Sequence, residues 1–476
     1  MPKQHKDQKY TFEERDGKWY SGRMQVDPFQ DWKAMDIQLT SFDRPHMRAF
    51  HMSWMSFFIA FVCWFAFAPL MSTVRTEFGM TPKQVYAVGI ASVASTVSAR
   101  FIVGPLCDKL GPKRCQIFLL SWVTFFVFLS PLVNGVKSLA LVRFAIGFGG
   151  ATFVVTQYWS TQMFVSEIVG VANATTGGWG NLGGGVTQIL MGWLFAMFSK
   201  VYPASKAWRM SMIVPACLTA CVTAVLFFFS DDSPRGDYNM LYTMGVLETK
   251  SAKDSARRGF ANINSWILGM QYACCFGIEL HVNNNLAFYL ANTDSFAVGV
   301  LDAAAVASLF GLMNLFARSM GGGISDMLGK LMGMRGRLLA QAICLLGEGV
   351  CLVIFSYQTT LPTLVPALIC FSLCTQAAEG STFSVVPYVE PAAIGGVCAV
   401  VGAWGNIGAI LWGLTFLYGY SGKAADGFTT LGYIVIASAF LTFAVRIEGY
   451  SHLLGGEDKK DKKMNAVPTK DIEAEK

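Results

Sequence analysis

Apolar residues are grouped along this chain in uncharged blocks of about 20 residues, separated by short polar stretches. About 20 helical residues cross a hydrocarbon core roughly 30 Å thick, so each block predicts a transmembrane helix. No apolar stretch follows a short basic start within residues 1–50, so we expect no cleavable signal peptide. The pattern predicts twelve spans, at residues 53–74, 84–106, 115–134, 138–160, 167–198, 208–229, 264–290, 297–324, 337–356, 361–387, 392–419 and 428–447.

A polar stretch in the middle of the chain divides the predicted helices six and six. Basic residues follow the second, sixth and eighth helices and fill the tail, and all of them lie on one side of the membrane if both termini are cytoplasmic. The expected parts are a cytoplasmic segment (1–50), a six-helix half (51–230), a cytoplasmic linker (231–262), a second six-helix half (263–448) and a disordered cytoplasmic tail (449–476).

The composition excludes several classes of protein. Hydrophobic residues make up 53% of the chain and charged residues 14%, which indicates a polytopic protein embedded in a lipid bilayer. The net charge of +6 lies mainly in loops and tail, so nothing points to a nucleic-acid partner. Most of the twelve cysteines lie in apolar spans without a CxxC pair, and we interpret them as small core residues. His281 is the only histidine within a predicted span, which leaves no pair of haem ligands. We expect no metal, no cofactor and no enzymatic activity.

Glycine-rich segments occur at matching places in the two halves. GGWGNLGGG at Gly177–Gly185 and GAWGNIGA at Gly402–Ala409 both lie inside apolar sequence of membrane length. Glycine costs roughly 1 kcal/mol relative to alanine inside a helix, so these runs predict the close approach of another helix or a ligand. The pair indicates an internal repeat.

Two further pairs of segments match in the same order. ARFIVGPLCDKLG at 99–111 corresponds to ARSMGGGISDMLG at 317–329, and GGATF at 149–153 corresponds to EGSTF at 379–383. A duplicated bundle of six plus six helices is typical of a secondary transporter, whose site lies between the halves near the midplane.

Several of these motifs resemble known families. GPLCDKLGPKR at 104–114 and RFAIGFG at 143–149 are similar to the loop motif and the fourth-span Arg-Gly motif of the major facilitator superfamily. GWGNLGGGVTQ and AWGNIGA resemble the paired signatures of its nitrate/nitrite porter family, and ATFVVTQYW, FGIEL and AAEGSTFSVVP resemble the high-affinity nitrate transporters of plants and algae. The resemblance extends from about Asp43 to Glu448. It implies an all-α transmembrane bundle of twelve helices in two pseudo-symmetric halves.

Two arginines occupy equivalent positions near the middle of predicted helices. Arg100 and Arg318 each lie eight residues before an aspartate expected at the cytoplasmic end of a span. Eight helical residues rise about 12 Å, close to the centre of a core about 30 Å thick. A charged side chain in the middle of the membrane is costly. A small oxyanion that accepts hydrogen bonds from both guanidinium groups would explain why two arginines lie there. The alternative is an arginine satisfied by carbonyl groups or by an acidic neighbour. The resemblance implies that both arginines bind nitrate.

Aromatic and amide side chains are further candidates for the substrate pocket. The resemblance implies that Phe153 and Phe383 flank the anion and that Tyr272 donates a hydrogen bond to it; core packing and an ordinary interhelical bond are the alternatives. Amides at Asn181 and Asn406 either donate to an oxyanion or bond a facing helix. The substrate-binding candidates are Arg100, Arg318, Asn181, Phe153, Phe383, Tyr272, Asn406, Gly180 and Gly405.

Coupling of anion uptake to proton movement requires a side chain that binds and releases a proton. Moving one negative charge inward against the membrane potential costs about 2.3 kcal/mol per 100 mV, whereas one proton neutralises the movement and two make it favourable. Glu379 and Glu279, in the tenth and seventh predicted spans, are the candidate proton carriers; structural pairing with an arginine is the alternative. Glu348, in the ninth span, is expected to pair with an arginine.

Asp108 and Asp326 are candidate gate residues. In the superfamily the matching aspartate holds the cytoplasmic side closed through charge and helix-end contacts. We expect that the partners of Asp108 come from the basic residues Lys109, Lys113, Arg114 and Arg143.

These observations predict an importer of nitrate, and of nitrite as well, that works by proton symport and alternating access in the plasma membrane. A nitrate/nitrite exchanger would use the same anion site without a proton, and a nitrate sensor would bind without sustained transport. Many plant and algal members of the similar branch need a small single-span accessory protein, and the sequence leaves open whether this chain does.

Overall fold

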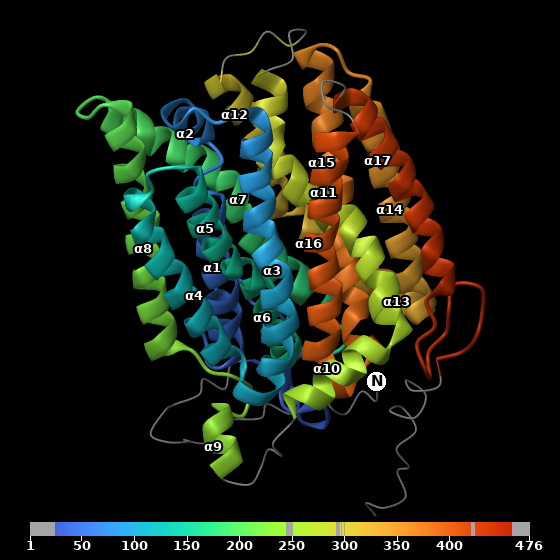
Figure 1. Ribbon diagram of the computed structural model, residues 1–476. Helices are drawn as coiled ribbons and strands as arrows, with labels where there is room; N and C mark the ends of the chain where they lie inside the picture. Colours follow the sequence, from blue (N-terminus) through green and yellow to red (C-terminus); the bar gives the residue numbers. More distant parts are fainter. Residues whose placement is uncertain are drawn as a thin grey trace, which may run out of the picture.

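The computed structural model describes residues 24–243, 251–291, 296, 298, 300–419 and 424–458. Nearly all the described elements are helices, and most of them run side by side in one bundle (Figure 1). A small antiparallel hairpin precedes the bundle, with β1 (Val26–Asp27) paired to β2 (Lys33–Ala34) around η2 (Pro28–Gln30). Predictions for residues 1–23 and for the disorder of 459–476 concern positions outside the described residues.

The first half of the bundle follows the predicted spans, except that the first helix begins at His46 and ends at Phe65, earlier than the predicted 53–74. Local sequence explains where its helices begin: Thr81 caps the second long helix, because its side chain accepts from the Gln84 amide at 3.3 Å and Gln84 bonds back to the Thr81 amide. The elements are α1 (His46–Phe65), α2 (Met71–Phe78), α3 (Pro82–Leu110), α4 (Pro112–Leu129), η3 (Ser130–Leu132), α5 (Val136–Gly147), η4 (Phe148–Ala151), α6 (Thr152–Met163), α7 (Val169–Ser199) and α8 (Ala204–Phe229).

The second half repeats this arrangement after two linker helices. The linker helices are α9 (Tyr238–Thr243) and α10 (Ala252–Ala261). The remaining elements are α11 (Ile263–Ala291), α12 (Val300–Leu312), η5 (Met313–Leu315), α13 (Ala317–Met332), α14 (Met334–Ser356), α15 (Leu361–Val389), η6 (Pro391–Ala393), α16 (Ile394–Tyr418), α17 (Ala424–Ala439) and η7 (Phe440–Ala444).

Nine helical stretches within the described residues are long and apolar enough to cross a membrane. They are Lys83–Leu110, Pro112–Leu132, Val136–Met163, Val169–Ser199, Ala204–Phe229, Met334–Ser356, Leu361–Val389, Pro391–Tyr418 and Ala425–Ala444. Together with α1, α11 and the α12–α13 segment, they are consistent with the predicted twelve spans. Large apolar side chains cover the outside of the bundle, as lipid requires: examples are Phe118, Phe125, Trp193, Phe228 and Ile343.

Two of the spans are interrupted by 3₁₀ turns, which the hydrophobic pattern did not predict. The fourth span changes from α5 to α6 through η4, and the eighth changes from α12 to α13 through η5 and the non-helical residue Phe316. In a 3₁₀ turn a backbone carbonyl accepts from the amide three residues later instead of four, so its direction differs from that in an α-helix. Both interruptions lie next to a buried arginine: η4 contacts Arg100, and η5 precedes the helix turn that carries Arg318.

Helices of the two halves touch closely through glycine, both at Gly185 in the first glycine-rich segment, as predicted, and at Gly104 outside these segments. A Cβ atom built at Gly104 of α3 would lie 2.4 Å from the carbonyl oxygen of Gly395 at the start of α16. A Cβ atom at Gly185 of α7 would lie 2.8 Å from the backbone of Gly311 on α12. Any larger residue at these positions would push the halves apart.

One end of the bundle carries the linker and the hairpin, and we call it the α10 end (Figure 1). Helix α10 packs against α3 and α16, one helix from each half. The hairpin adds to the α6–α7 loop, since the Val165 amide donates to the Ala34 carbonyl at 3.1 Å. Arg44 and Asp231 form an ion pair that ties the entry of α1 to the segment after α8.

Candidate functional site

The two predicted arginines lie in the centre of the bundle, one from each half. Arg100 extends from α3 and Arg318 from the first turn of α13, and neither side chain is exposed to solvent. Because α13 begins only after the break at Phe316, the Arg318 side chain starts at a helix end.

Arg100 is held by backbone carbonyls of both halves. Its Nε and Nη2 donate to the Gly150 carbonyl in η4 at 3.0 and 2.8 Å, and Nη1 donates to the Gly402 carbonyl of α16 at 2.5 Å. These partners are neutral, so no carboxylate compensates the guanidinium charge directly. Gly402 opens the second glycine-rich repeat, which gives that repeat a polar role beyond helix packing.

Arg318 is held by an acid and a phenol. Its Nη1 forms an ion pair with Glu379 of α15, and Nη2 donates to the Tyr272 hydroxyl of α11 at 3.0 Å. The Nε of Arg318 has no hydrogen-bond partner among the described residues. One donor of this buried cation is therefore unused.

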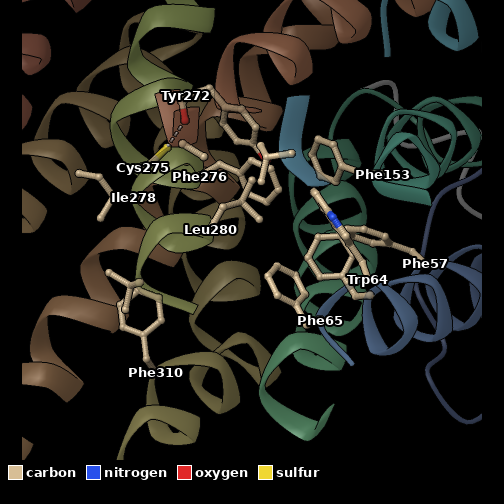
Figure 2. Close-up of a cluster of buried hydrophobic side chains, with 14 of the residues drawn as sticks. Phe57, Trp64, Phe65, Phe153, Tyr272, Cys275, Phe276, Ile278, Leu280 and Phe310 are labelled. Carbon is tan, nitrogen blue, oxygen red and sulfur yellow. Dashed lines mark hydrogen bonds between the residues drawn. The ribbon is translucent and has the colours of Figure 1, made fainter. Parts of the chain in front are cut away.

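A cluster of aromatic rings that includes Phe153, Tyr272 and Phe276 lies in the core of the bundle (Figure 2), and both guanidinium groups contact it. The Phe153 ring centroid lies 4.9 Å from the Arg100 Cζ and 5.1 Å from the Arg318 Cζ. Phe383 meets Phe153 edge-on at 4.9 Å, and Tyr272 stacks on Phe276 at 5.0 Å. The structure therefore brings Phe153, Phe383 and Tyr272 together with both arginines. Phe276, which also lies 5.0 Å from Arg100, was missed as a site residue, although its position one turn after Tyr272 could have indicated it.

The two candidate proton carriers lie beside this cluster and share one amide. Asn181 Nδ2 donates to Glu279 Oε2 at 2.9 Å and to Glu379 Oε2 at 3.3 Å. Asn314, in η5, donates to Glu279 Oε1 at 2.7 Å. Both glutamates are fully buried. The sequence did not single out Asn314, whose place in a 3₁₀ turn only the fold reveals.

The other substrate-pocket candidates have different surroundings. Asn406 Nδ2 donates to the Gly402 carbonyl of its own helix at 3.2 Å, so it supports the carbonyl that holds Arg100. A Cβ atom at Gly405 would lie 2.6 Å from the Phe276 ring, and one at Gly180 would lie 1.7 Å from the Phe57 ring. Both glycines make room for aromatic side chains.

Glu348 does not pair with an arginine, contrary to expectation. No ion pair to it is found in the part of the chain that the structure describes, and neither carboxylate oxygen has a hydrogen-bond partner there. The arginines of the second half are engaged elsewhere: Arg318 with Glu379, and Arg337 with Asp326.

The two gate candidates join the halves at the α10 end. Asp108 of α3 accepts from the Ser255 hydroxyl of α10 at 2.5 Å, and that hydroxyl also accepts from the Gly396 amide in the first turn of α16 at 3.1 Å. Asp326 of α13 accepts from the Val171 amide in the first turn of α7 at 2.6 Å. Asp326 therefore bonds the N-terminus of a helix from the other half directly, and Asp108 does so through Ser255; free amides and the helix dipole favour a negative charge there.

One of the basic partners expected for Asp108, Arg143, is too far away. Arg143 lies in the other end of the bundle, beside Gly89, and Arg114 is exposed to solvent. Gly89 and Asp108 are both on α3, and the 19 residues between their positions rise about 28 Å. The arginine that does engage a gate is Arg337, which pairs with Asp326 and donates to the Ser166 carbonyl at 3.3 Å. Linear spacing could not show these distances.

The central cluster thus holds two buried cations and two buried carboxylates. Arg318 already binds an anionic group, Glu379, while Arg100 has only carbonyl partners. A small anion entering this cluster competes with Glu379 for Arg318. The geometry suits anion binding linked to the state of a carboxylate.

Comparisons with known proteins agree with this architecture. The family model described as Major Facilitator Superfamily matches residues 53–413. The human organic anion transporter MFSD10 (TETRAN) superposes with a TM-score of 0.60 at 14% sequence identity, covering 83% of this chain and 99% of that chain, which shows the fold alone.

Curated relatives from plants and algae cover most of the chain. "High-affinity nitrate transporter 2.3" of Oryza sativa subsp. japonica is 35% identical over 439 residues, 92% of this chain and 84% of the relative. "High affinity nitrate transporter 2.5" of Arabidopsis thaliana is 37% identical over 407 residues, 85% and 80% of the two chains. "Nitrate transporter 2.1" of Chlamydomonas reinhardtii is 35% identical over 439 residues, 89% and 79% of the two chains. The chain therefore belongs to the major facilitator superfamily and, within it, to the family of the plant and algal high-affinity nitrate transporters.

Proposed function

We propose that this chain imports nitrate, and nitrite by the same route, through proton-coupled alternating access. The names of its relatives support nitrate as the substrate. The observation that carries the mechanism is the buried Arg318–Glu379 ion pair, which lies beside a second buried arginine.

Arg100 and Arg318 are the proposed anion ligands. Guanidinium groups are planar, permanently charged and able to donate two parallel hydrogen bonds to an oxyanion. The unused Nε of Arg318 supplies one such donor, and the Tyr272 hydroxyl lies beside the same guanidinium group. Phe153 and Phe383 line the space between the arginines with rings, which suits a flat, weakly hydrated anion.

Glu379 links anion binding to proton binding. When nitrate occupies Arg318, it displaces the Glu379 carboxylate, which is then a buried charge without a cation. Such a group is neutralised by taking up a proton. Asn181 connects Glu379 to Glu279, so the second carboxylate is placed to accept another proton or to pass one on. Two protons with one nitrate bring in net positive charge, which an inside-negative potential favours.

Alternating access is proposed to depend on the aspartates at the α10 end. Asp108 and Asp326 hold the first turns of α16 and α7, so their release lets the halves separate there. We assign the α10 end and both termini to the cytoplasm and the protein to the plasma membrane, in line with the positions of the basic residues.

The test is nitrate-evoked current in oocytes that express the chain, with and without a single-span accessory protein, at acidic and neutral external pH. Wild type should give inward current that grows on acidification. Glu379→Gln should remove the dependence on pH while nitrate still binds, because Arg318 keeps its donors and loses its competitor. Arg318→Lys should remove the current.

Glu390→Gln is the matched control, since Glu390 is a partly exposed glutamate at the α10 end that faces Arg258 at 3.8 Å. It should behave as wild type. Electroneutral, pH-independent uptake by wild type would indicate the exchanger, and binding of labelled nitrate without accumulation would indicate the sensor. Full pH dependence in Glu379→Gln would remove that residue from the coupling mechanism.

A further inference from the structure

A cavity with several polar side chains in its lining lies between the halves, at the end of the bundle opposite the α10 end. It has a volume of about 60 Å³ and is lined by residues of α2, α3, α5, α11 and α16 and of the connection between α1 and α2. A single water needs roughly 10–15 Å³ on this measure, so the cavity has room for a small ion with some of its water. Its polar lining consists of Arg143, His281, Asn284 and Asn285.

Arg143 is a buried cation that the central site does not use. Its side chain is only 4% exposed, and no hydrogen bond or ion pair to it is found among the residues that the structure describes. The nearest ring is that of Phe67, 6.0 Å from the Arg143 Cζ. A buried charge without a partner is strongly unfavourable, so this arginine is suited to a mobile counter-ion.

His281 places a second unused donor in the same cavity. Its Nδ1 lies 3.4 Å from Asn285 Nδ2, which can only donate, so the ring proton belongs on Nε2. That Nε2 is buried and has no hydrogen-bond partner among the described residues. Phe416 packs against the ring at 4.5 Å and holds its position.

The charge of the cavity selects an anion. Its lining contains one arginine, one histidine and no aspartate or glutamate. Glu279 is close in sequence, but its two oxygens accept from Asn181 and Asn314 in the central cluster. A cation would therefore meet only positive or neutral groups in this cavity.

The cavity also adjoins the central site. Leu280, in its lining, lies one helical turn from Phe276, which packs over Arg100. Val93, also in its lining, lies two turns before Arg100 on α3, a rise of about 10 Å. The cavity and the central arginine Arg100 therefore lie along the same helix, α3, with the cavity nearer the end opposite the α10 end.

We propose that Arg143 and His281 form an outer subsite for a small oxyanion, which nitrate occupies before it reaches Arg100 and Arg318. The identity of the anion rests on the proposed function. The subsite raises the local concentration of anion at the entrance, and charged clefts of this kind raise association rates by about 10- to 1,000-fold.

Uptake kinetics give the first test. Arg143→Gln should raise the KM for labelled nitrate on the order of tenfold and change Vmax by less than about twofold. Arg143→Lys should have a KM close to that of wild type, because lysine keeps the positive charge. The matched control is Arg209→Gln, because Arg209 is another arginine of the first half but is paired with Glu77. An unchanged KM in Arg143→Gln would overturn the subsite.

Equilibrium binding separates this inference from the proposed function. Titration of purified Arg318→Gln protein with sodium nitrate should still show one weak site, and the Arg143→Gln/Arg318→Gln double variant should show none. Complete loss of binding in Arg318→Gln alone would overturn the outer subsite. If wild type binds no nitrate but binds perchlorate, another small oxyanion, at one site that depends on Arg143, the proposed function fails and the subsite stands. Thermal unfolding midpoints equal to wild type confirm that each variant is folded.

Discussion

Replacing Asp326 with asparagine should open the α10 end of the bundle. One Asp326 oxygen accepts from the Val171 amide of α7 at 2.6 Å, and the other pairs with the buried Arg337. The Val171 amide lies in the first turn of α7, where it has no acceptor within its own helix. Asparagine has nearly the same shape but carries no charge and offers only one acceptor oxygen.

The size of the effect follows from these contacts. A hydrogen bond to a charged group contributes about 1.5–3 kcal/mol, and breaking a buried ion pair from one side costs about 3–5 kcal/mol. We take about 3 kcal/mol, because asparagine keeps one of the two contacts. Each 1.4 kcal/mol changes an equilibrium constant by a factor of about ten. The ratio of closed to open molecules should therefore fall on the order of 100-fold.

Hydrogen–deuterium exchange of the first turn of α7 measures how often the α10 end opens. Protection of the Val171 amide should fall by about 10- to 100-fold in Asp326→Asn, while the middle of α7 stays protected. Asp254→Asn is the control, because Asp254 forms an exposed pair with Arg258 at the same end and should leave α7 unchanged. Wild-type protection in Asp326→Asn would refute the role of this carboxylate in closing the bundle.

Three further predictions concern the anion site, the helix contact and the effect of pH. Arg100→Lys should raise the KM for nitrate uptake by more than about tenfold, because one ammonium group cannot replace the forked donors that bond Gly150 and Gly402 together; a wild-type KM would exclude a role for the fork. Gly104→Val should hold the α10 end apart, because a Cβ there meets the Gly395 carbonyl at 2.4 Å; labelled nitrate uptake should be lost while the folded protein is still recovered. Burial raises the pKa of Asp232, in the segment between α8 and α9, to about 7. Since the folded protein favours the protonated acid more than the unfolded chain does, stability should fall as pH rises from about 4 to about 7 and level off above that; the unfolding midpoint should drop between about pH 5 and pH 7 in wild type and less in Asp232→Asn.

The sequence by itself determined the architecture of this protein. Twelve apolar blocks predicted twelve spans because a membrane leaves a chain few ways to satisfy its backbone polar groups. The repeated segments predicted two equivalent halves, and eight residues of helix between each arginine and its aspartate predicted central guanidinium groups. The structure places Arg100 and Arg318 in the middle of the bundle with Phe153, Phe383 and Tyr272 around them. Helical rise is a local property, so spacing along one helix is sufficient to predict height.

The partners of each charge were decided only by the tertiary structure. Glu379 pairs with Arg318, but Glu348 on the neighbouring helix pairs with none in the described chain, and both were simply buried glutamates in the sequence. Arg143 was expected near Asp108, yet it lies at the opposite end of the bundle with His281. Likewise, η4 and η5 place the Gly150 carbonyl and Asn314 in the centre, although nothing in the hydrophobic pattern marks these turns. Which side chains meet depends on the rotation of each helix and on contacts between residues more than 200 positions apart, such as Arg100 and Gly402, and periodicity along one helix carries no information about either.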